Sequence, residues 1–279
     1  MNRILTTHVG SLPTLESVEA VVRKQREIGL GLINEGEYTK GGDWLSYVEE
    51  RFGGFEPRPP SPGERPLITQ GRDREAFAEF YRHATERGTL FYAPGEQIKR
   101  VRPLWHCTEP VTYRGQASLK REIGTLLEFA RPEEAFLTST APGSLEVYRR
   151  NEYYRSDEEF VYAIAEAMRV EYETIAAAGV TLQVDDAWLP ALWDRIGIPM
   201  GFPAFLKYSA VRVEALNHAL RNVPADKVRY HLCWGSWHGP HAFDLEFEKI
   251  VDLMLRVKAK AYLIEAANAR HEHEYAVWD

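Results

Sequence analysis

Short apolar runs alternate with longer amphipathic stretches along most of the chain. The runs are rich in residues that strands favour, and the stretches between them repeat apolar residues at helical spacing. The clearest predicted strands are residues 135–139, 180–184, 228–233 and 261–266, and the clearest predicted helices are residues 119–130, 157–178, 203–221 and 245–258. This order predicts parallel strands joined by right-handed crossovers.

The first third of the chain shows the same alternation less regularly. Its predicted strands are residues 3–9, 30–34 and 100–106, and its predicted helices are residues 15–28 and 74–86. Gly29 and Gly31 follow the first of these helices, where glycine commonly ends a helix. The number of units favours one (β/α)8 barrel over residues 1–279, rather than an open doubly wound sheet.

Residues 52–71 interrupt this pattern with a group of prolines, namely Pro57, Pro59, Pro60, Pro62 and Pro66. Proline lacks a backbone donor, which excludes a helix or a central strand. We expect an extended excursion over the barrel mouth or at an oligomer contact. A surface loop without a functional role is the alternative.

Composition and charge narrow the class of protein. Of the 279 residues, 44% are hydrophobic and 27% are charged, as in an ordinary globular domain, and the net charge of −7 gives no reason to expect nucleic acid or an anionic membrane as partner. No run approaches the ~20 apolar residues of a spanning helix, so we expect a cytoplasmic protein. In a reducing compartment Cys107 and Cys233 should be free thiols or metal ligands.

A possible metal site follows the predicted strand at residues 228–233. His231 and Cys233 are two positions apart, so their side chains point to one face of a strand. Alone this is a weak signal, because such a pair more often reflects packing. Glu265 ends the next predicted strand and would complete a nitrogen, sulfur and oxygen ligand set for Zn²⁺, with one position open to a substrate thiol that zinc would hold as thiolate.

Other polar residues also fall where strands end. Ser11, Glu37 and Asp185 lie at or just beyond such ends, where a barrel of this kind collects its active site. Helix capping is the alternative for Asp185 and the expected role of its neighbour Asp186.

Histidines supply the candidates for proton transfer. His238 and His241 follow the strand that carries Cys233, and His271 lies in the R-H-E-H-E motif at residues 270–274. The alternatives are that His238 and His241 are loop histidines without a role, and that residues 270–274 are the polar start of a helix. Arg270 could pair with a carboxylate or sulfonate of the substrate.

Five motifs together resemble the cobalamin-independent methionine synthase family. They are T-T-H-V-G-S-L-P at residues 6–13, N-E-G-E at 34–37, L-Q-V-D-D at 182–186, H-L-C at 231–233 and I-E-A-A-N at 264–268. They cover essentially the whole chain in the family's order. The closer likeness is to the short single-barrel members, which include the epoxyalkane:coenzyme M transferases.

The resemblance implies roles for the matching residues. It makes His231, Cys233 and Glu265 zinc ligands, and it places the thiol substrate against Ser11 and Glu37. Asp185 matches the aspartate that binds the substrate amino group, although Asp186 stands where the family has glutamate, which puts this role in doubt.

The activity implied is transfer of a methyl or other alkyl group to a thiol such as homocysteine, in methionine biosynthesis or a related reaction. The donor stays open among a folate, a corrinoid protein and an epoxide opened by a thiol of the coenzyme M type. A catalytically silent barrel that acts as a binding or oligomerisation module is the alternative, and a metal-free barrel like uroporphyrinogen decarboxylase is a third. The protein could also form a homo-oligomer.

One departure concerns the end of the chain. The family supplies another zinc-ligating cysteine and a candidate acid histidine near the eighth strand, whereas the seventh predicted strand here ends near Glu265 and the sequence stops at Asp279. We expect a fragment of a longer product rather than an open barrel, because an open barrel exposes strand edges. Cys107 follows a different predicted strand and is a poor substitute ligand.

Overall fold

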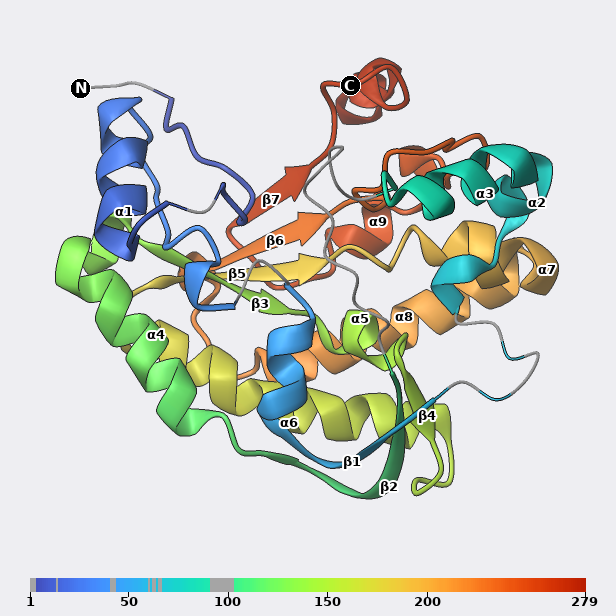
Figure 1. Ribbon diagram of the computed structural model, residues 1–279, viewed down its shortest axis with the longest axis horizontal. Helices are drawn as coiled ribbons and strands as arrows, with labels where there is room; N and C mark the ends of the chain where they lie inside the picture. Colours follow the sequence, from blue (N-terminus) through green and yellow to red (C-terminus); the bar gives the residue numbers. More distant parts are fainter. Residues whose placement is uncertain are drawn as a thin grey trace.

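A parallel four-stranded sheet forms the centre of the protein in the computed structural model, which describes residues 4–13, 15–40, 44–59, 61, 64, 67–90 and 103–279. The strands are β3 (Phe136–Thr140), β5 (Thr181–Asp186), β6 (Val228–Leu232) and β7 (Ala261–Ile264), in the order β3-β5-β6-β7 (Figure 1). Every neighbouring pair is parallel. The carboxyl ends of all four strands therefore meet at one edge of the sheet.

Long helices precede β3, β5 and β6 in the chain and cover the sheet (Figure 1). They are α4 (Gln116–Phe129), α6 (Asp157–Ala177) and α8 (Phe202–Ala219). Ser156 begins α6 by accepting a hydrogen bond from the backbone of Glu159, as an N-cap does. The helix then packs against β3, β5 and α8, and the apolar residues between them form the core. Core residues on these elements include Leu137, Ile164, Met168, Leu182, Val184, Val213 and Leu232.

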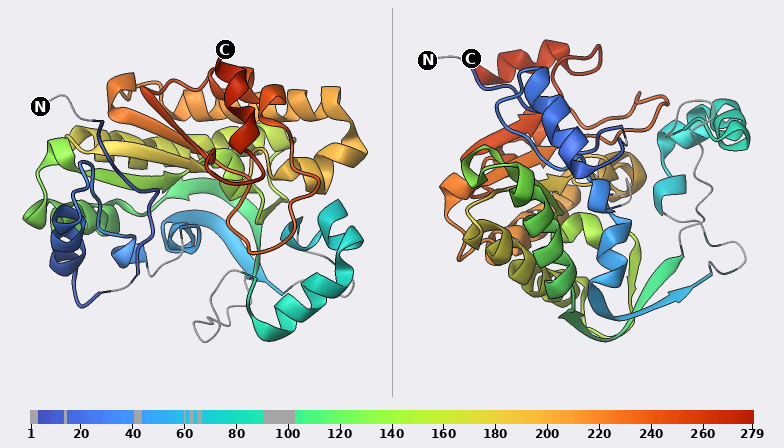
Figure 2. Two further views of the ribbon diagram at one scale, coloured as in Figure 1. Left: turned by 90° about the horizontal axis from the view of Figure 1, so that it is seen from above. Right: turned by 60° about the vertical axis from the view of Figure 1, so that its left-hand side comes forward.

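The shorter helices lie at the ends and edges of this unit. They are α1 (Val18–Glu27), α2 (Arg72–Ala76), α3 (Ala78–Arg87), α5 (Pro142–Glu146), α7 (Ile198–Met200) and α9 (Val251–Met254). Helices α2 and α3 stand to one side of the sheet, as both views of Figure 2 show. In the described part of the chain, no helix has the length and apolar character needed to cross a membrane.

A second sheet begins in the proline-rich segment. Phe52–Arg58 forms β1, which pairs antiparallel with β2 (Leu104–Tyr113), and β2 pairs parallel with β4 (Arg149–Asn151). Pro57 is accommodated because β1 lies at the sheet edge, where one side of the strand needs no partner. The excursion is therefore a strand at its start, and several of its prolines lie outside the described residues.

The N-terminal strands were also predicted wrongly. The described residues 4–9 form no strand, and within residues 30–34 only Ile33 makes a bridge, to Ala135. Isolated hydrogen bonds hold residues 6–8 instead. The backbone N–H groups of Gly31 and Leu32 donate to the Thr6 carbonyl, and Arg229 donates to the Thr7 hydroxyl and to the His8 carbonyl at 3.0 Å each. The predicted helix at residues 245–258 is likewise reduced to α9 and the short 3₁₀ helix Phe247–Lys249.

The predicted α/β class with a parallel sheet is confirmed. The four strands of the central sheet form an open arc, to which Ile33 adds a bridge, and the described strands do not close into a barrel.

Candidate functional site

Asp185 and His231 face each other at the carboxyl ends of β5 and β6. The two residues are partners in the strand register, and Nδ1 of His231 lies 2.8 Å from Oδ1 of Asp185. Gln183 donates to the same oxygen at 2.6 Å. The carboxylate therefore fixes the orientation of the imidazole ring.

Cys233 lies against His231, as the strand geometry predicts. Burial alone would lower the pKa of His231, but the charge of Cys233 and hydrogen bonds with Asp185 and Cys233 raise it to about 10. A histidine whose ring is held by a carboxylate, beside a thiol, is the arrangement found around zinc ligands. These two predicted ligands are thus brought together.

Glu265 lies near Cys233 in the strand register, but its carboxylate is paired with Arg270. Leu232 pairs with Ile264, so Cys233 and Glu265 each come next on neighbouring strands. The carboxylate of Glu265 accepts a hydrogen bond from Arg270 at 2.6 Å. No set of three or more His, Cys, Asp or Glu side chains in the described residues is arranged to hold a metal ion. The nitrogen, sulfur and oxygen donors of His231, Cys233 and Glu265 suit Zn²⁺. Glu265, however, is not grouped with the other two residues.

Glu37 forms a second, fully buried part of the site. Ser11 donates to its Oε2 at 2.5 Å and Thr138 of β3 donates to its Oε1 at 2.8 Å. Its backbone has a φ of 58°, a strained value for a residue other than glycine. Gly10 permits the close approach, since a Cβ there would lie 3.0 Å from Oε1 of Glu37.

A buried ion cluster stands behind Glu37. The ammonium of Lys40 lies 2.8 Å from the Thr138 hydroxyl and 3.5 Å from Glu122 of α4. Burial, and then the charge of Glu122, raise the pKa of Glu35 to about 7. The sequence reasoning missed Lys40 and Thr138; the available signal for Thr138 was a polar side chain inside an otherwise apolar strand.

The two parts of the site are close enough to interact electrostatically. Burial raises the pKa of Glu37, and the charge of Asp185 raises it further. Asp186 is buried and accepts hydrogen bonds from Ser144 at 2.7 Å and from Tyr230 at 2.8 Å, besides one from the backbone of Leu189. The expected role of Asp186 is to cap a helix, and its carboxylate also binds the side chains of Ser144 and Tyr230.

The candidate histidines differ in their surroundings. His241 stacks on Trp237 and its Nδ1 lies 3.0 Å from Asp244, while Nε2 of His271 lies 3.5 Å from the same carboxylate. Burial lowers the pKa of His271, but the carboxylates of Asp244 and Glu274 raise it above its usual value. His238 is exposed. Sequence reasoning missed Asp244, which joins two of the three histidines.

Cys107 lies apart from this edge. It is fully buried on β2, in the other sheet, where burial raises the pKa of its thiol to about 11. It is a core residue in the structure.

Comparison with known proteins identifies relatives of one kind. No protein-family model matches the chain. A methionine synthase from Saccharolobus solfataricus is 30% identical over 239 residues, which are 84% of this chain and 57% of that protein. A methionine synthase from Sulfolobus acidocaldarius is 21% identical over 84% of this chain and 56% of its own length. The chain therefore spans somewhat more than half the length of these curated relatives.

Two solved structures share the fold. A B12-independent methionine synthase from a Shewanella species, in complex with selenomethionine, matches 82% of this chain and 61% of its own, with a TM-score of 0.54 and 15% identity. A putative vitamin-B12 independent methionine synthase from Listeria monocytogenes matches 84% of this chain and 67% of its own, with a TM-score of 0.56 and 18% identity.

Proposed function

We propose that this chain, which belongs to the cobalamin-independent methionine synthase family, transfers a methyl or other alkyl group to a thiol such as homocysteine in a zinc-dependent reaction. The observation that carries the proposal is the placement of His231 and Cys233 beside Asp185 at the ends of two parallel strands. Active sites of α/β folds lie at this end of the strands.

His231, Cys233 and Glu265 would hold the zinc ion. When bound, Zn²⁺ would lower the pKa of a substrate thiol and so provide a nucleophile at neutral pH. Asp185 keeps the ring of His231 oriented, and Arg270 must release Glu265 before that carboxylate can act as a ligand.

The buried part of the site would bind the remainder of the thiol substrate. In the described part of the chain, both hydrogen bonds that the Asp185 carboxylate accepts are made to Oδ1, so Oδ2 would receive a substrate amino group. Ser11 and Glu37 would contact the substrate near Asp185, since the charge of Asp185 raises the pKa of Glu37. A substrate contact of this kind would account for the strained backbone of the buried Glu37.

Asp244 with His241 and His271 would accept or supply a proton. The two rings share one carboxylate, and the raised pKa of His271 favours its protonated form, so His271 would supply the proton. His238 is exposed and has the weakest case as a catalytic residue.

The sheet would be an arc of a (β/α)8 barrel. The single bridge from Ile33 to Ala135 supports this proposal, because it places a further parallel segment beside β3.

A direct assay tests the activity. The zinc-loaded protein is incubated with homocysteine or coenzyme M and with a methyl folate, methylcobalamin or an epoxide, and the alkylated thiol is quantified. We expect product from one donor, and loss of product in Cys233→Ser but not in Cys107→Ala. Absence of product with every pair would favour the silent binding module.

A further inference from the structure

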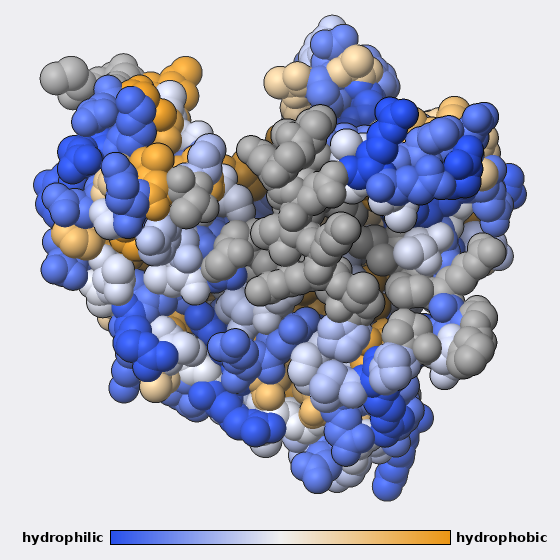
Figure 3. All heavy atoms as spheres, in the orientation of Figure 1, coloured by the Kyte–Doolittle hydropathy of each residue, from blue (hydrophilic) through white to orange (hydrophobic). Residues whose placement is uncertain are grey.

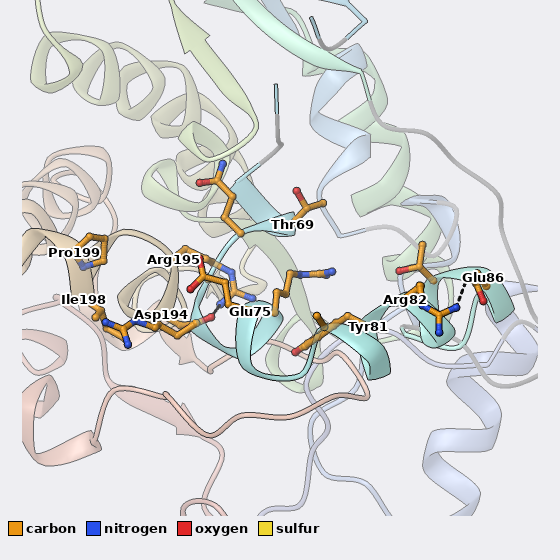
Figure 4. A pocket seen from close by; sticks show the side chains of 15 residues that line it. Thr69, Glu75, Tyr81, Arg82, Glu86, Asp194, Arg195, Ile198 and Pro199 are labelled. Carbon is orange, nitrogen blue, oxygen red and sulfur yellow. Dashed lines mark hydrogen bonds and ion pairs between the residues drawn. The ribbon is translucent and has the colours of Figure 1, made fainter. Parts of the chain in front are cut away.

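A cavity of about 950 Å³ lies between residues 69–86 and residues 194–199, the latter in the segment that follows β5. Helices α2 and α3 form one wall, and the π-helical turn Trp193–Gly197 with the start of α7 forms the other (Figure 4). Pockets of about 300–1,000 Å³ are typical for small organic ligands. The cavity is therefore large enough for more than a single inorganic ion.

Two arginines on opposite walls carry positive charge into this cavity. Arg195 is 7% exposed, and its Nε has no hydrogen-bond partner in the described part of the chain. Arg74 of α2 also lines the cavity, and its Nε is likewise buried without a partner among the described residues. Buried guanidinium donors without partners are costly and indicate that a ligand is expected there.

The nearby carboxylates do not neutralise both charges. Asp194 lies 3.1 Å from Nη1 of Arg195 and also accepts the backbone N–H of Asp73. Glu86 is paired with Arg82 at 3.1 Å on the cavity rim. Arg74 has no carboxylate within salt-bridge distance in the described residues and instead lies 4.5 Å from the ring of Tyr81. Glu75 also lines the cavity, but no ion pair joins it to Arg74 in the described residues, so the Arg74 guanidinium is available to an anionic ligand.

Burial and mutual repulsion support the same conclusion. Burial lowers the pKa of Arg74, and the charge of Arg195 lowers it further. Burial is also the main cause that lowers the pKa of Arg195. A bound anion would relieve both effects, because an opposite charge favours the ionised guanidinium.

The remaining walls suit an organic body. Ile198 and Pro199 line the cavity opposite Tyr81. Hydrophilic side chains predominate on the face of α2 and α3 that Figure 3 shows. Trp237, from the loop after β6, packs on Arg195 with 4.6 Å between the guanidinium carbon and the ring, and donates to the hydroxyl of Tyr81 at 3.2 Å.

We propose that this cavity binds a small organic anion whose carboxylate, sulfonate or phosphate pairs with Arg74 and Arg195 and whose body lies against Tyr81, Ile198 and Pro199. Guanidinium groups bind all three oxyanions through paired hydrogen bonds. The site uses none of the residues proposed to hold zinc or the thiol, so it can be tested independently of the proposed activity.

Calorimetric titration of the full chain tests this proposal. Inorganic phosphate and glutarate, added at constant ionic strength, serve as separate probes for phosphate and carboxylate ligands. We expect saturable binding of at least one probe below about 10 mM and a loss of affinity of about tenfold or more in Arg74→Gln, because the variant loses charge-assisted hydrogen bonds to the anion. Arg195→Lys, which keeps the charge but not the forked geometry, should also weaken binding.

Matched controls separate this site from the rest of the protein. Arg82→Gln removes a rim arginine that is already paired, and it should change the affinity less than about threefold. Cys233→Ser should bind the anion as the wild type does. The proposal is overturned if neither probe binds saturably, or if a folded Arg74→Gln protein binds both as tightly as the wild type.

Discussion

The two parts of the candidate site differ in how far they are assembled. Around Glu37 every partner is in place: Ser11 and Thr138 hold the carboxylate, and Lys40 stands behind it with 6% of its surface exposed. At the ends of β6 and β7, Cys233 is half-buried and Glu265 pairs with Arg270 rather than with the other proposed ligands.

The difference has a physical origin. Thr138 and Glu122 lie inside regular elements, so the packing of β3 and α4 fixes the cluster around Lys40 before any ligand arrives. Cys233 and Glu265 lie just past the ends of their strands, where the backbone ladder no longer restrains them. The buried part should therefore govern stability, and the strand-end part should respond to metal and substrate.

The largest effect should come from Cys233→Ser. We expect alkyl transfer to fall by about a thousandfold or more together with loss of zinc, because removing the partners of metal ligands alone costs roughly 10–100-fold. Zinc content and product formation measure this, with Cys107→Ala as the control that retains zinc. Full zinc binding by Cys233→Ser would contradict the proposal that the strand-end part of the site holds the metal.

Lys40→Met should instead act on stability. Removing this cation leaves Glu122 short of one partner in a buried setting, and a loss of about 3–5 kcal/mol in the free energy of unfolding is expected. Urea denaturation measures it. Arg23→Met removes only exposed ion pairs with Glu19 and Glu27 and should cost less than about 0.5 kcal/mol. Similar losses in the two variants would contradict the special role of the cluster.

The pH dependence of stability should also reside in the buried part. The pKa of Glu35 is about 7 in the folded protein against 4.5 for the ordinary group, so the folded state retains this proton more strongly. The resulting stabilisation is complete below pH 4.5 and is lost as pH rises through about 7, a change of about 3 kcal/mol.

Glu35→Gln should remove this loss. Urea denaturation of wild type and variant at pH 4.5 and pH 8 gives the comparison, and the variant should gain about 3 kcal/mol relative to wild type at the higher pH. Parallel pH profiles for the two proteins would show that Glu35 titrates normally.

The smallest effect is expected for Arg270→Gln. The side chains of Glu265 and Arg270 are 34% and 28% exposed, so loss of their ion pair should cost less than about 1 kcal/mol of stability. Freed from Arg270, Glu265 should bind zinc about two- to fivefold more tightly, as a competitive zinc titration would show. Arg256→Gln, in another exposed ion pair, is the control. Weaker zinc binding in Arg270→Gln would contradict the proposed competition.

The sequence predicted the parallel sheet well, because strands such as Thr181–Asp186 are short apolar runs between strongly periodic helices. It also placed His231 and Cys233 correctly on one face, since period-two geometry is local. It could not reveal Lys40 or Asp244, whose partners are distant along the chain. It also assigned residues 3–9 to a strand, whereas the described residues 4–9 form none.

Zinc-edge X-ray absorption on the purified protein, before and after addition of homocysteine, tests the central claim most directly. We predict a shell that includes nitrogen at about 2.0–2.1 Å and sulfur at about 2.3 Å, with one more sulfur once homocysteine is present. A protein that takes up no zinc, or one whose zinc shell contains no sulfur and is unchanged by Cys233→Ser, would contradict the account.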